Sequence, residues 1–450
     1  MSEPPPGVVD LDGFRYPLRA LVASIDGDPV GVLAESAGVW TFTYSAEWLR
    51  RPDRYPLSPS LPLVTEPVQD GSSLRPVQWY FDNLLPEEAQ RQLMAGEAGI
   101  RVADAFGLLA YYGSESAGSL TLLPPDTPRA AGGTVALSDA ELSARIRALP
   151  RQSLAAGAPK RMSLAGAQHK LAVVVAGRQL LQPVGSAPST HILKPDHPEA
   201  EYPHSVANEW FVMQLARRMG LDVPRVERRY VPEPVYLIER FDRAISADGV
   251  QRLHAIDACQ LLNLDRQFKY QQGSIEVLGR IAGLCRARLQ TRWRLYDWLV
   301  FNLLTGNSDA HLKNLSFLIG PGGVALAPHY DLLCTVCYES RAYDMDVWPS
   351  ESTLAWPVLG ATRFSDLDFS LVVQAGIGMG LTERRARDQL DRMRTRIMGE
   401  AKALLSATEA ENAALPTDLR IGPTLAGEGR CLRTVTYGVI QEMVRRLAPA

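Results

Sequence analysis

The chain has 450 residues, of which 46% are hydrophobic and 22% are charged, and its formal net charge is -3 at pH 7. A chain of this length is too long for one compact core, so we expect two or three domains. The composition is ordinary for a globular protein, which excludes a disordered or fibrous chain. The small negative charge argues against strong nucleic-acid binding by the chain alone.

The start of the chain, Met1–Pro6, lacks the basic end and apolar centre of a secretory signal. No later stretch approaches the roughly 18 uncharged apolar residues that suggest a transmembrane helix. We therefore expect a cytoplasmic protein that does not engage a membrane.

Residues 1–125 are predicted to form an N-terminal domain of mixed α/β structure. Asp26-Gly27 lies between two apolar runs, which indicates a β-hairpin within residues 20–32. The further elements expected here are a strand at 40–45, a helix around 84–96 and a closing strand at 117–123. A stretch rich in Pro and Gly follows at 124–133 and is predicted to be a linker.

Residues 135–245 are predicted to form a second domain with the element order of a protein-kinase small lobe. Ser138 followed by Glu141 predicts the start of a helix. The elements expected after it are a loop at 161–170, strands at 171–175, 179–183 and 190–194, a helix at 204–219, and two strands around 232–234, the second at 235–241.

Lys194 stands near the end of the third of these strands, where an ammonium group could reach the α- and β-phosphates of ATP. Its neighbours Ile192 and Leu193 indicate a buried strand, in which an unpaired charge is costly. Glu209 lies 15 residues further on, in the next helix, and could pair with Lys194. The alternative is that either side chain forms a surface salt bridge elsewhere.

The loop at 163–170 matches neither the Walker A pattern nor Gly-x-Gly-x-x-Gly. Its one glycine, Gly166, stands among small residues before Lys170, and small residues let backbone N–H groups approach a phosphate closely. The alternative, on these residues alone, is a plain turn before a strand.

Residues 246–450 are predicted to form a mainly helical large lobe. Its apolar helix at 290–304 leads into a loop in which Asp309 precedes Asn314 by five residues. Protein kinases use this spacing for an aspartate that accepts the proton of the substrate hydroxyl and an asparagine that holds Mg²⁺. The loop therefore suggests phosphoryl transfer.

A hairpin turned by Gly320-Pro321-Gly322-Gly323 is predicted to return Asp331 to the side of Asp309. Asp331 would then hold Mg²⁺ as the aspartate of Asp-Phe-Gly does, although the sequence here reads Tyr-Asp-Leu-Leu. Each acid alone would more often cap a loop turn. Together with Asn314 and the hairpin, the two acids favour a catalytic site.

The five cysteines are odd in number and scattered, which favours free thiols in a reducing compartment. Cys334 and Cys337 form a single Cys-x-x-Cys pair, a weak zinc or redox signal. Their apolar neighbours favour simple burial.

Residues 382–406 are predicted to form an amphipathic helix rich in arginine between positions 384 and 396. A solvated face is the favoured interpretation. The alternative is contact with a partner protein or with DNA phosphates.

Several of these motifs resemble the HipA toxins of bacterial type II toxin–antitoxin systems. They are Ser163–Lys170, Thr190–Lys194, Asn208–Trp210, Glu239–Arg243, Gly306–Asn314 and Tyr330–Asp331, and Phe81–Pro86 is similar to the family's N-terminal subdomain. The resemblance covers most of the chain. It implies an α+β, two-lobed protein-kinase-like fold of the phosphatidylinositol-kinase type, with an N-terminal mixed α/β subdomain and a mainly helical C-terminal lobe.

The resemblance also implies roles for individual residues. Asp309 would be the catalytic base, Asn314 and Asp331 would hold Mg²⁺, and Glu239–Phe241 would form the adenine hinge. Ser163 would be autophosphorylated, which ejects the loop and inactivates the kinase. The residues implied to bind ATP are Ala165, Gly166, Ala167, Gln168, His169, Lys170, Lys194, Glu239, Arg240, Phe241, His311, Asn314 and Asp331.

The implied function is that of an ATP- and Mg²⁺-dependent serine/threonine protein kinase that acts as a toxin on a translation factor such as an aminoacyl-tRNA synthetase. The implied partner is a helix-turn-helix antitoxin of the HipB type, through which alone the chain would meet operator DNA. The alternatives are a catalytically idle binding subunit of the antitoxin–operator complex and a kinase for a small molecule. The intact set of candidate site residues favours an active kinase.

Overall fold

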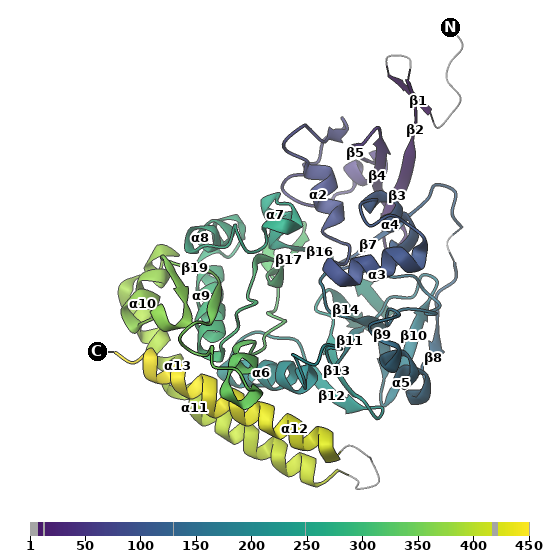
Figure 1. The fold of residues 1–450 in the computed structure, drawn as a ribbon. Coiled ribbons are helices and arrows are strands. Elements are labelled where there is room, and N and C mark those ends of the chain that lie inside the picture. The colour runs from purple at the N-terminus through teal and green to yellow at the C-terminus, as the bar shows by residue number, and fades with distance from the viewer. Residues whose placement is uncertain (1–7, 12–13, 129, 248, 416–421, 450) are drawn as a thin grey trace.

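An antiparallel five-stranded sheet, in the order β6-β5-β4-β3-β7, organises the N-terminal region (Figure 1). The computed structural model describes residues 8–11, 14–128, 130–247, 249–415 and 422–449. The predicted hairpin and closing strand are confirmed, since β3 pairs with both β4 and β7. The elements are β1 (Val8–Leu11), β2 (Phe14–Pro17), β3 (Arg19–Ile25), β4 (Asp28–Ser36), β5 (Val39–Tyr44), α1 (Ala46–Arg50), β6 (Val68–Gln69), α2 (Pro76–Asp82), α3 (Glu88–Ala98), α4 (Ala105–Tyr112) and β7 (Leu120–Leu123).

A six-stranded sheet, in the order β12-β13-β11-β9-β10-β8, forms the small lobe. Its strands pair antiparallel throughout, and every strand predicted for this lobe is present. The Ser138 hydroxyl accepts a hydrogen bond from the Glu141 N–H, which caps the first helix as predicted. The elements are β8 (Gly133–Ala136), α5 (Asp139–Ala148), β9 (Leu171–Ala176), β10 (Gln179–Val184), β11 (His191–Pro195), α6 (Ser205–Met219), β12 (Val226–Tyr230), β13 (Pro234–Glu239), β14 (Arg243–Ser246) and β15 (Gly249–Arg252).

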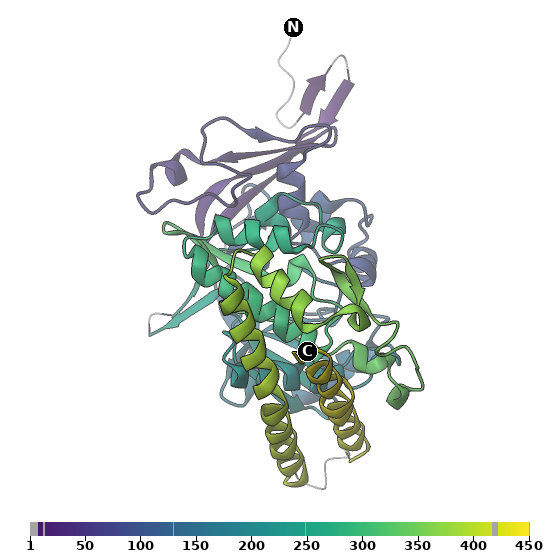
Figure 2. The ribbon, with the colours of Figure 1, turned by 90° about the vertical axis from the view of Figure 1, so that its left-hand side faces the viewer.

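The remaining region is mainly helical, with a small sheet in the order β16-β17-β18 beside the helices. The α-helices and strands are β16 (Ala255–Asp257), α7 (Ala258–Leu262), α8 (Ile275–Leu284), α9 (Arg288–Thr305), β17 (Ser316–Gly320), β18 (Gly323–Leu326), β19 (Thr353–Val358), β20 (Ala361–Arg363), α10 (Phe369–Gly378), α11 (Glu383–Ala413), α12 (Gly422–Arg433) and α13 (Gln441–Arg446). Short 3-10 turns lie at Arg266–Phe268, Leu312–Asn314, Val336–Glu339, Arg341–Tyr343 and Phe364–Asp366, and a π-helix spans Thr434–Ile440. The long helices α11 and α12 extend away from the body, at the end opposite the β1–β2 ribbon (Figure 2).

Two apolar cores stabilise the chain. The smaller lies within the small lobe and includes Leu142, Leu171 and Leu237. The larger is continuous from Phe81 of the N-terminal region to Phe301 of α9. Burial of apolar side chains is the main favourable term in folding. The N-terminal region therefore folds against the large lobe as part of one core rather than as a loosely tethered module.

The structure differs from the sequence predictions in several elements. Helices α2 and α4 and strands β8, β14 and β15 were not predicted, and strands β16, β19 and β20 interrupt a region that was expected to be mainly helical. Helix α3 begins at Glu88 and not near residue 84, because the preceding segment makes hydrogen bonds to the 161–170 loop instead.

The predictions for the cysteines and for the arginine-rich helix are confirmed. All five cysteines are buried and free, and the arginine-rich helix exists as α11 with most of its arginines exposed. Ion pairs at i,i+4 spacing join Arg384 to Asp388 and Arg387 to Glu383 on its surface. Over the described ranges, no helix combines the length and apolar character needed to cross a bilayer.

Candidate active site

Lys194 lies at the meeting point of three elements. Strand β11 carries it, and its Nζ donates to Oε1 of Glu209 on α6 at 2.9 Å and to Oδ1 of Asp331 at 2.5 Å. The side chains of Lys194 and Glu209 are only 9% and 3% exposed, whereas that of Asp331 is 31% exposed. The lysine is thus paired on its inner side and faces a partly open carboxylate on the other.

The charges of this cluster favour an ionised Asp331. Although burial alone would raise its pKa, the ammonium groups of Lys194 and Lys170 lower the pKa of Asp331 to about 2. Burial raises the pKa of Glu209 despite its contact with Lys194, and the pKa of Lys194 is raised by its two carboxylates against the effect of burial. At neutral pH the site therefore presents an ammonium group next to a carboxylate.

The catalytic-type loop begins where α9 ends at Gly306, whose φ of 65° is the left-handed conformation common after helices. The N–H of Asp309 donates to Oδ1 of Asn307 at 3.0 Å, and Nδ2 of Asn314 donates to the Asp309 carbonyl at 2.8 Å. The loop is thus held by its own side chains, and the backbone of Asp309 is fixed.

Tyr270 is a site residue that the sequence did not reveal. Its hydroxyl donates to Oδ1 of Asp309, and its ring packs edge-to-face on His311 with 4.9 Å between centroids. No motif marks Tyr270, since its partner lies 39 residues away in the chain. Asp309 is half-buried beneath this contact.

His311 lies where the charges of both aspartates act on it. Burial lowers its pKa, whereas the carboxylates of Asp309 and Asp331 act in the opposite direction. Within the described residues, Nδ1 of His311 and Nδ1 of His169 are buried atoms without a hydrogen-bond partner. Buried polar atoms of this kind are rare and often mark a place for a ligand.

The 163–170 loop enters the site at Gly166, where φ is +102°, a conformation that side-chain-bearing residues rarely adopt. Nζ of Lys170 donates to the Ala165 carbonyl at 2.6 Å, which folds the loop back on itself. Burial lowers the pKa of Lys170 to about 8. Ala167 is exposed, and Gln168 is half-buried.

Ser163 is fully buried at the start of this loop. Its hydroxyl donates to the Leu84 carbonyl at 2.6 Å, and its N–H donates to the Glu115 carbonyl at 2.7 Å. The serine is thus held by the N-terminal region and does not face solvent.

The predicted hinge, Glu239–Phe241, begins at the last residue of β13. The N–H of Arg240 donates to the Thr190 carbonyl, and its guanidinium donates to Asp242 at 2.7 and 2.9 Å. Phe241 stacks on Tyr330 with 5.5 Å between centroids. The Arg240 carbonyl accepts from the Arg243 N–H at 3.3 Å, and Glu239 belongs to the β13 ladder.

The residues present fit ATP and Mg²⁺ in their chemistry. Lysine ammonium groups suit phosphates, and the ionised carboxylate of Asp331 with the amide oxygen of Asn314 suits Mg²⁺. Across the described part of the chain, no group of three or more His, Cys, Asp or Glu side chains converges as a metal cage. Mg²⁺ in phosphotransfer sites commonly takes one or two carboxylates and completes its shell with phosphates and water.

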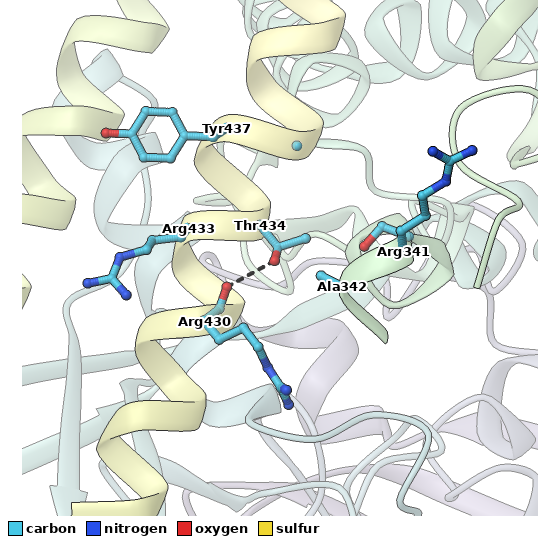
Figure 3. A pocket seen from close by; sticks show the side chains of 8 residues that line it. Arg341, Ala342, Arg430, Arg433, Thr434 and Tyr437 are labelled. Atoms are coloured by element: carbon cyan, nitrogen blue, oxygen red, sulfur yellow. Dashed lines mark hydrogen bonds between the residues drawn. The ribbon is translucent and has the colours of Figure 1, made fainter. Parts of the chain in front are cut away.

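A separate hollow of about 480 Å³ lies between the turn at Arg341–Tyr343 and the C-terminal helices (Figure 3). It is shallow and basic, and none of the nucleotide-site residues named above lines it. Arg341 and Arg433 are already paired with Asp346 and Glu409. Its lining is Ser340, Arg341, Ala342, Arg430, Arg433, Thr434, Tyr437 and Gly438.

Comparisons with known proteins agree with this geometry. The HipA N-terminal domain matches residues 21–123, and the HipA-like C-terminal domain matches residues 162–401. The chain belongs to the HipA family. It is accordingly an enzyme of the serine/threonine-protein kinase class, with a mixed α/β kinase-like fold.

Individual relatives support this assignment. The Sinorhizobium fredii protein named "Putative kinase Y4mE" is 37% identical over 392 residues, which cover 83% of this chain and 90% of that protein. The serine/threonine-protein kinase toxin HipA of Shewanella oneidensis is 30% identical over 333 residues, covering 69% and 74%. A chain of the solved S. oneidensis HipA, HipB and operator DNA complex matches with a TM-score of 0.74 and 25% identity, covering 94% of this chain and 99% of that one.

Proposed function

We propose that the chain is an ATP- and Mg²⁺-dependent kinase of serine or threonine in proteins and acts as the toxin of a toxin–antitoxin pair. The observation that carries the proposal is the contact of Lys194 with both Glu209 and Asp331, because it joins the phosphate-binding strand to the candidate metal ligand. A catalytically inactive binding domain would have no use for a lysine buried between two carboxylates, because buried ion pairs contribute little net folding stability.

The proposed reaction assigns a task to each group. Lys194 would hold the α- and β-phosphates, with Glu209 fixing its position, and Asp309 would accept the proton of the substrate hydroxyl. Asn314 and Asp331 would hold Mg²⁺, which when bound neutralises charge on the phosphate oxygens. Lys170 and the small residues of the 165–170 loop would cover the phosphates. His311 would contact the nucleotide through its unpartnered Nδ1.

Ser163 is proposed as the site of self-inactivation by autophosphorylation. Its buried hydroxyl faces the Leu84 carbonyl, which is a hydrogen-bond acceptor. A phosphoserine offers only acceptor oxygens and about two negative charges, so it would repel that carbonyl and could not remain buried there. Phosphorylation would therefore expel the loop that covers the nucleotide.

Intact-mass analysis of the purified chain after incubation with Mg-ATP tests the reaction and the site together. We expect one added phosphate on wild type and none on Asp309→Asn or Ser163→Ala. Asp388→Asn, a substitution on the exposed face of α11, is the matched control and should behave as wild type. A phosphate that persists in Asp309→Asn contradicts the assigned base, and one that persists in Ser163→Ala contradicts the assigned site.

The proposed partner is a helix-turn-helix antitoxin of the HipB type, because the S. oneidensis relative is found in a complex with HipB and operator DNA. The chain's net charge of -3 supports DNA contact through the antitoxin rather than directly. Gel-shift titration with operator DNA should show no shift for the chain alone and a supershift when antitoxin is present. Binding by the chain alone would contradict this arrangement.

The proposed substrate is a translation factor such as an aminoacyl-tRNA synthetase. Incubating cell extract with the chain and radioactive ATP, followed by identification of labelled proteins, tests it against the two alternatives. Labelling of no protein besides the chain would favour a binding subunit, and label confined to a small molecule would favour a small-molecule kinase.

A further inference from the structure

The segment Asn83–Glu87 reaches the candidate site from outside the two lobes. The Leu84 carbonyl accepts the Ser163 hydroxyl at 2.6 Å, and the Glu87 N–H donates to the Gly166 carbonyl at 3.2 Å. Pro86 and Gly166 also form a parallel bridge. One short piece of the N-terminal region therefore holds the 163–170 loop, the candidate phosphate loop, at both its entry and its glycine.

The same segment holds the loop at 306–314, the candidate catalytic loop, through Lys313, which stands directly before Asn314. Nζ of Lys313 donates to Oδ1 of Asn83 at 2.7 Å and to its carbonyl at 3.2 Å, and it lies 3.5 Å from Oε1 of Glu87. Asp257 is a further partner of this ammonium group. The Lys313 side chain is only 5% exposed, so these contacts replace water.

Glu87 makes a third link, to the segment that carries Tyr270. Its Oε2 accepts from Nζ of Lys269 at 2.7 Å, and the Lys269 carbonyl accepts from the N–H of Leu312 at 3.1 Å. The next residue, Tyr270, donates to the Asp309 carboxylate. Glu87 is therefore one ion pair away from the residue that contacts the candidate base.

Two neighbouring ammonium groups keep the Glu87 carboxylate ionised. Although burial alone would raise the pKa of Glu87, the ammonium groups of Lys313 and Lys269 lower it to about 2. Its side chain is only 3% exposed. The exposed neighbour Glu88 reaches Lys269 at 3.4 Å with a side chain that is 64% exposed, so the carboxylate within the protein is that of Glu87.

We propose that Asn83–Glu87 is a clamp that fixes the phosphate loop and the catalytic loop relative to each other, with Glu87 as a positioning residue for phosphoryl transfer. The inference rests on the proposed kinase reaction. One loop would place the phosphates and the other the base, and a misplacement of about 1 Å can cost roughly 100-fold in rate. Because both loops hold the same segment, release of either one loosens the other.

Glu87→Gln in the full chain tests the clamp, because glutamine keeps the size of the side chain and removes the charge that two lysines share. We expect kcat to fall roughly 10- to 100-fold while KM for ATP changes by less than about threefold. Amide exchange should accelerate in 163–170 and 309–314 and stay as in wild type in the β3–β4 hairpin. Glu66→Gln, at an exposed position of the same N-terminal region, is the matched control and should leave both measurements unchanged.

A purely structural role for Glu87 predicts a different result, namely faster exchange throughout the larger core with no selective change in the two loops. That outcome, or an unchanged kcat in Glu87→Gln, overturns the clamp. Glu87→Asp provides the second variant, because it retains the charge with a shorter side chain. It should recover at least a third of the lost kcat, and no recovery also counts against the inference.

The two proposals can fail separately. If wild type transfers no phosphate, the proposed function falls, and the exchange of the two loops in Glu87→Gln still decides the physical clamp. If wild type is active and Glu87→Gln is equally active, the kinase proposal stands and the clamp is wrong.

Discussion

Lys194 and Lys170 show how two lysines in one site acquire opposite properties. Lys194 has two carboxylates within hydrogen-bond distance, and its pKa is raised. Lys170 donates to a carbonyl, has Lys194 nearby, and its pKa is lowered to about 8. Burial destabilises the charged form of a lysine, and without a carboxylate in contact nothing compensates, so the pKa falls.

The first prediction concerns the pH dependence of ATP binding. Below pH 8 the Lys170 amine is protonated and attracts phosphate, and it loses the proton as pH rises through about 8. We expect Kd for Mg-ATP to increase roughly tenfold between pH 7 and pH 9.5, as measured by titration calorimetry. Lys170→Arg keeps its charge throughout this range and should bind with a nearly flat profile. An equally flat wild-type profile would contradict the role of Lys170.

The second prediction concerns Glu209. Glu209→Gln leaves the buried Lys194 with one carboxylate and should reduce kcat/KM roughly 100-fold, since the lysine is then free to move. The free energy of unfolding should fall by about 3 kcal/mol in urea titrations, because breaking a buried ion pair exposes the full cost of burying its partner. Glu201→Gln, on an exposed turn nearby, is the control. Equal stability of the two variants would show that the Lys194–Glu209 pair is not coupled to folding.

At the scale of elements, the catalytic loop depends on how α9 ends. Gly306 has φ +65°, and a Cβ there would come within 2.4 Å of the Val336 side chain and 2.6 Å of the Val439 side chain. Gly220, which ends α6 with φ +90°, has nothing within 4 Å of the same position. The two glycines share a backbone conformation and differ in the space around them.

The third prediction uses this difference. Gly220→Ala should cost about 1 kcal/mol of unfolding free energy, which is the penalty of the left-handed conformation alone. Gly306→Ala should cost a further 1–3 kcal/mol, roughly, because the added methyl group also overpacks the core. Chemical denaturation measures both values. Equal losses would mean that the residues around Gly306 move aside without cost.

The hairpin β17–β18 is the element that completes the candidate metal-binding side of the site. It returns the chain so that Asp331 reaches Lys194, and φ of Asp331 is +58°. Aspartate tolerates this left-handed conformation better than most residues. The hairpin thus turns a separation of 137 residues in the sequence into a contact of 2.5 Å.

At the scale of the whole molecule, Glu115 joins the N-terminal region to the small lobe. It is 1% exposed and accepts from Lys160, Arg243 and Arg252 at 2.7, 2.9 and 3.3 Å. Arg240 of the predicted hinge lies 3.5 Å away. One carboxylate thereby links the start of the phosphate loop to the hinge.

The fourth prediction is that Glu115→Gln lowers the free energy of unfolding by about 4 kcal/mol at pH 7, because several buried cations lose a shared partner. Burial alone would raise the pKa of Glu115, but the four cations hold it below the usual range. Its stabilisation is therefore complete above about pH 5 and declines as pH falls below the unfolded-state value near 4.3. Urea titration should show a smaller difference between variant and wild type at pH 3, and Glu66→Gln is the exposed control.

The division into residues 1–125, 135–245 and 246–450 stays a prediction. The continuous larger core and the Glu115 contacts argue that these parts cooperate in folding. A single transition in calorimetry would support cooperation, because independent domains would unfold in separate steps.

The sequence alone determined the features that depend on short stretches of the chain. The Asp309–Asn314 spacing, the strand that carries Lys194, the turn that returns Asp331 and the resemblance to HipA were all readable, because each depends on residues close together in the chain. Periodicity, turns and motif spacing are short-range properties, and they predicted the strands of the small lobe well.

What only the tertiary structure decided was which distant groups share a buried space. Lys269 meets Glu87 across 182 residues, Lys313 meets Asn83 across 230, and Ser163 meets Leu84 across 79. No motif encodes such pairs, because they arise when separate apolar faces pack into one core and carry their polar groups with them. For this reason the candidate catalytic residues could be named from the sequence, whereas the contacts of Tyr270 and of Asn83–Glu87 could be seen only in the folded chain.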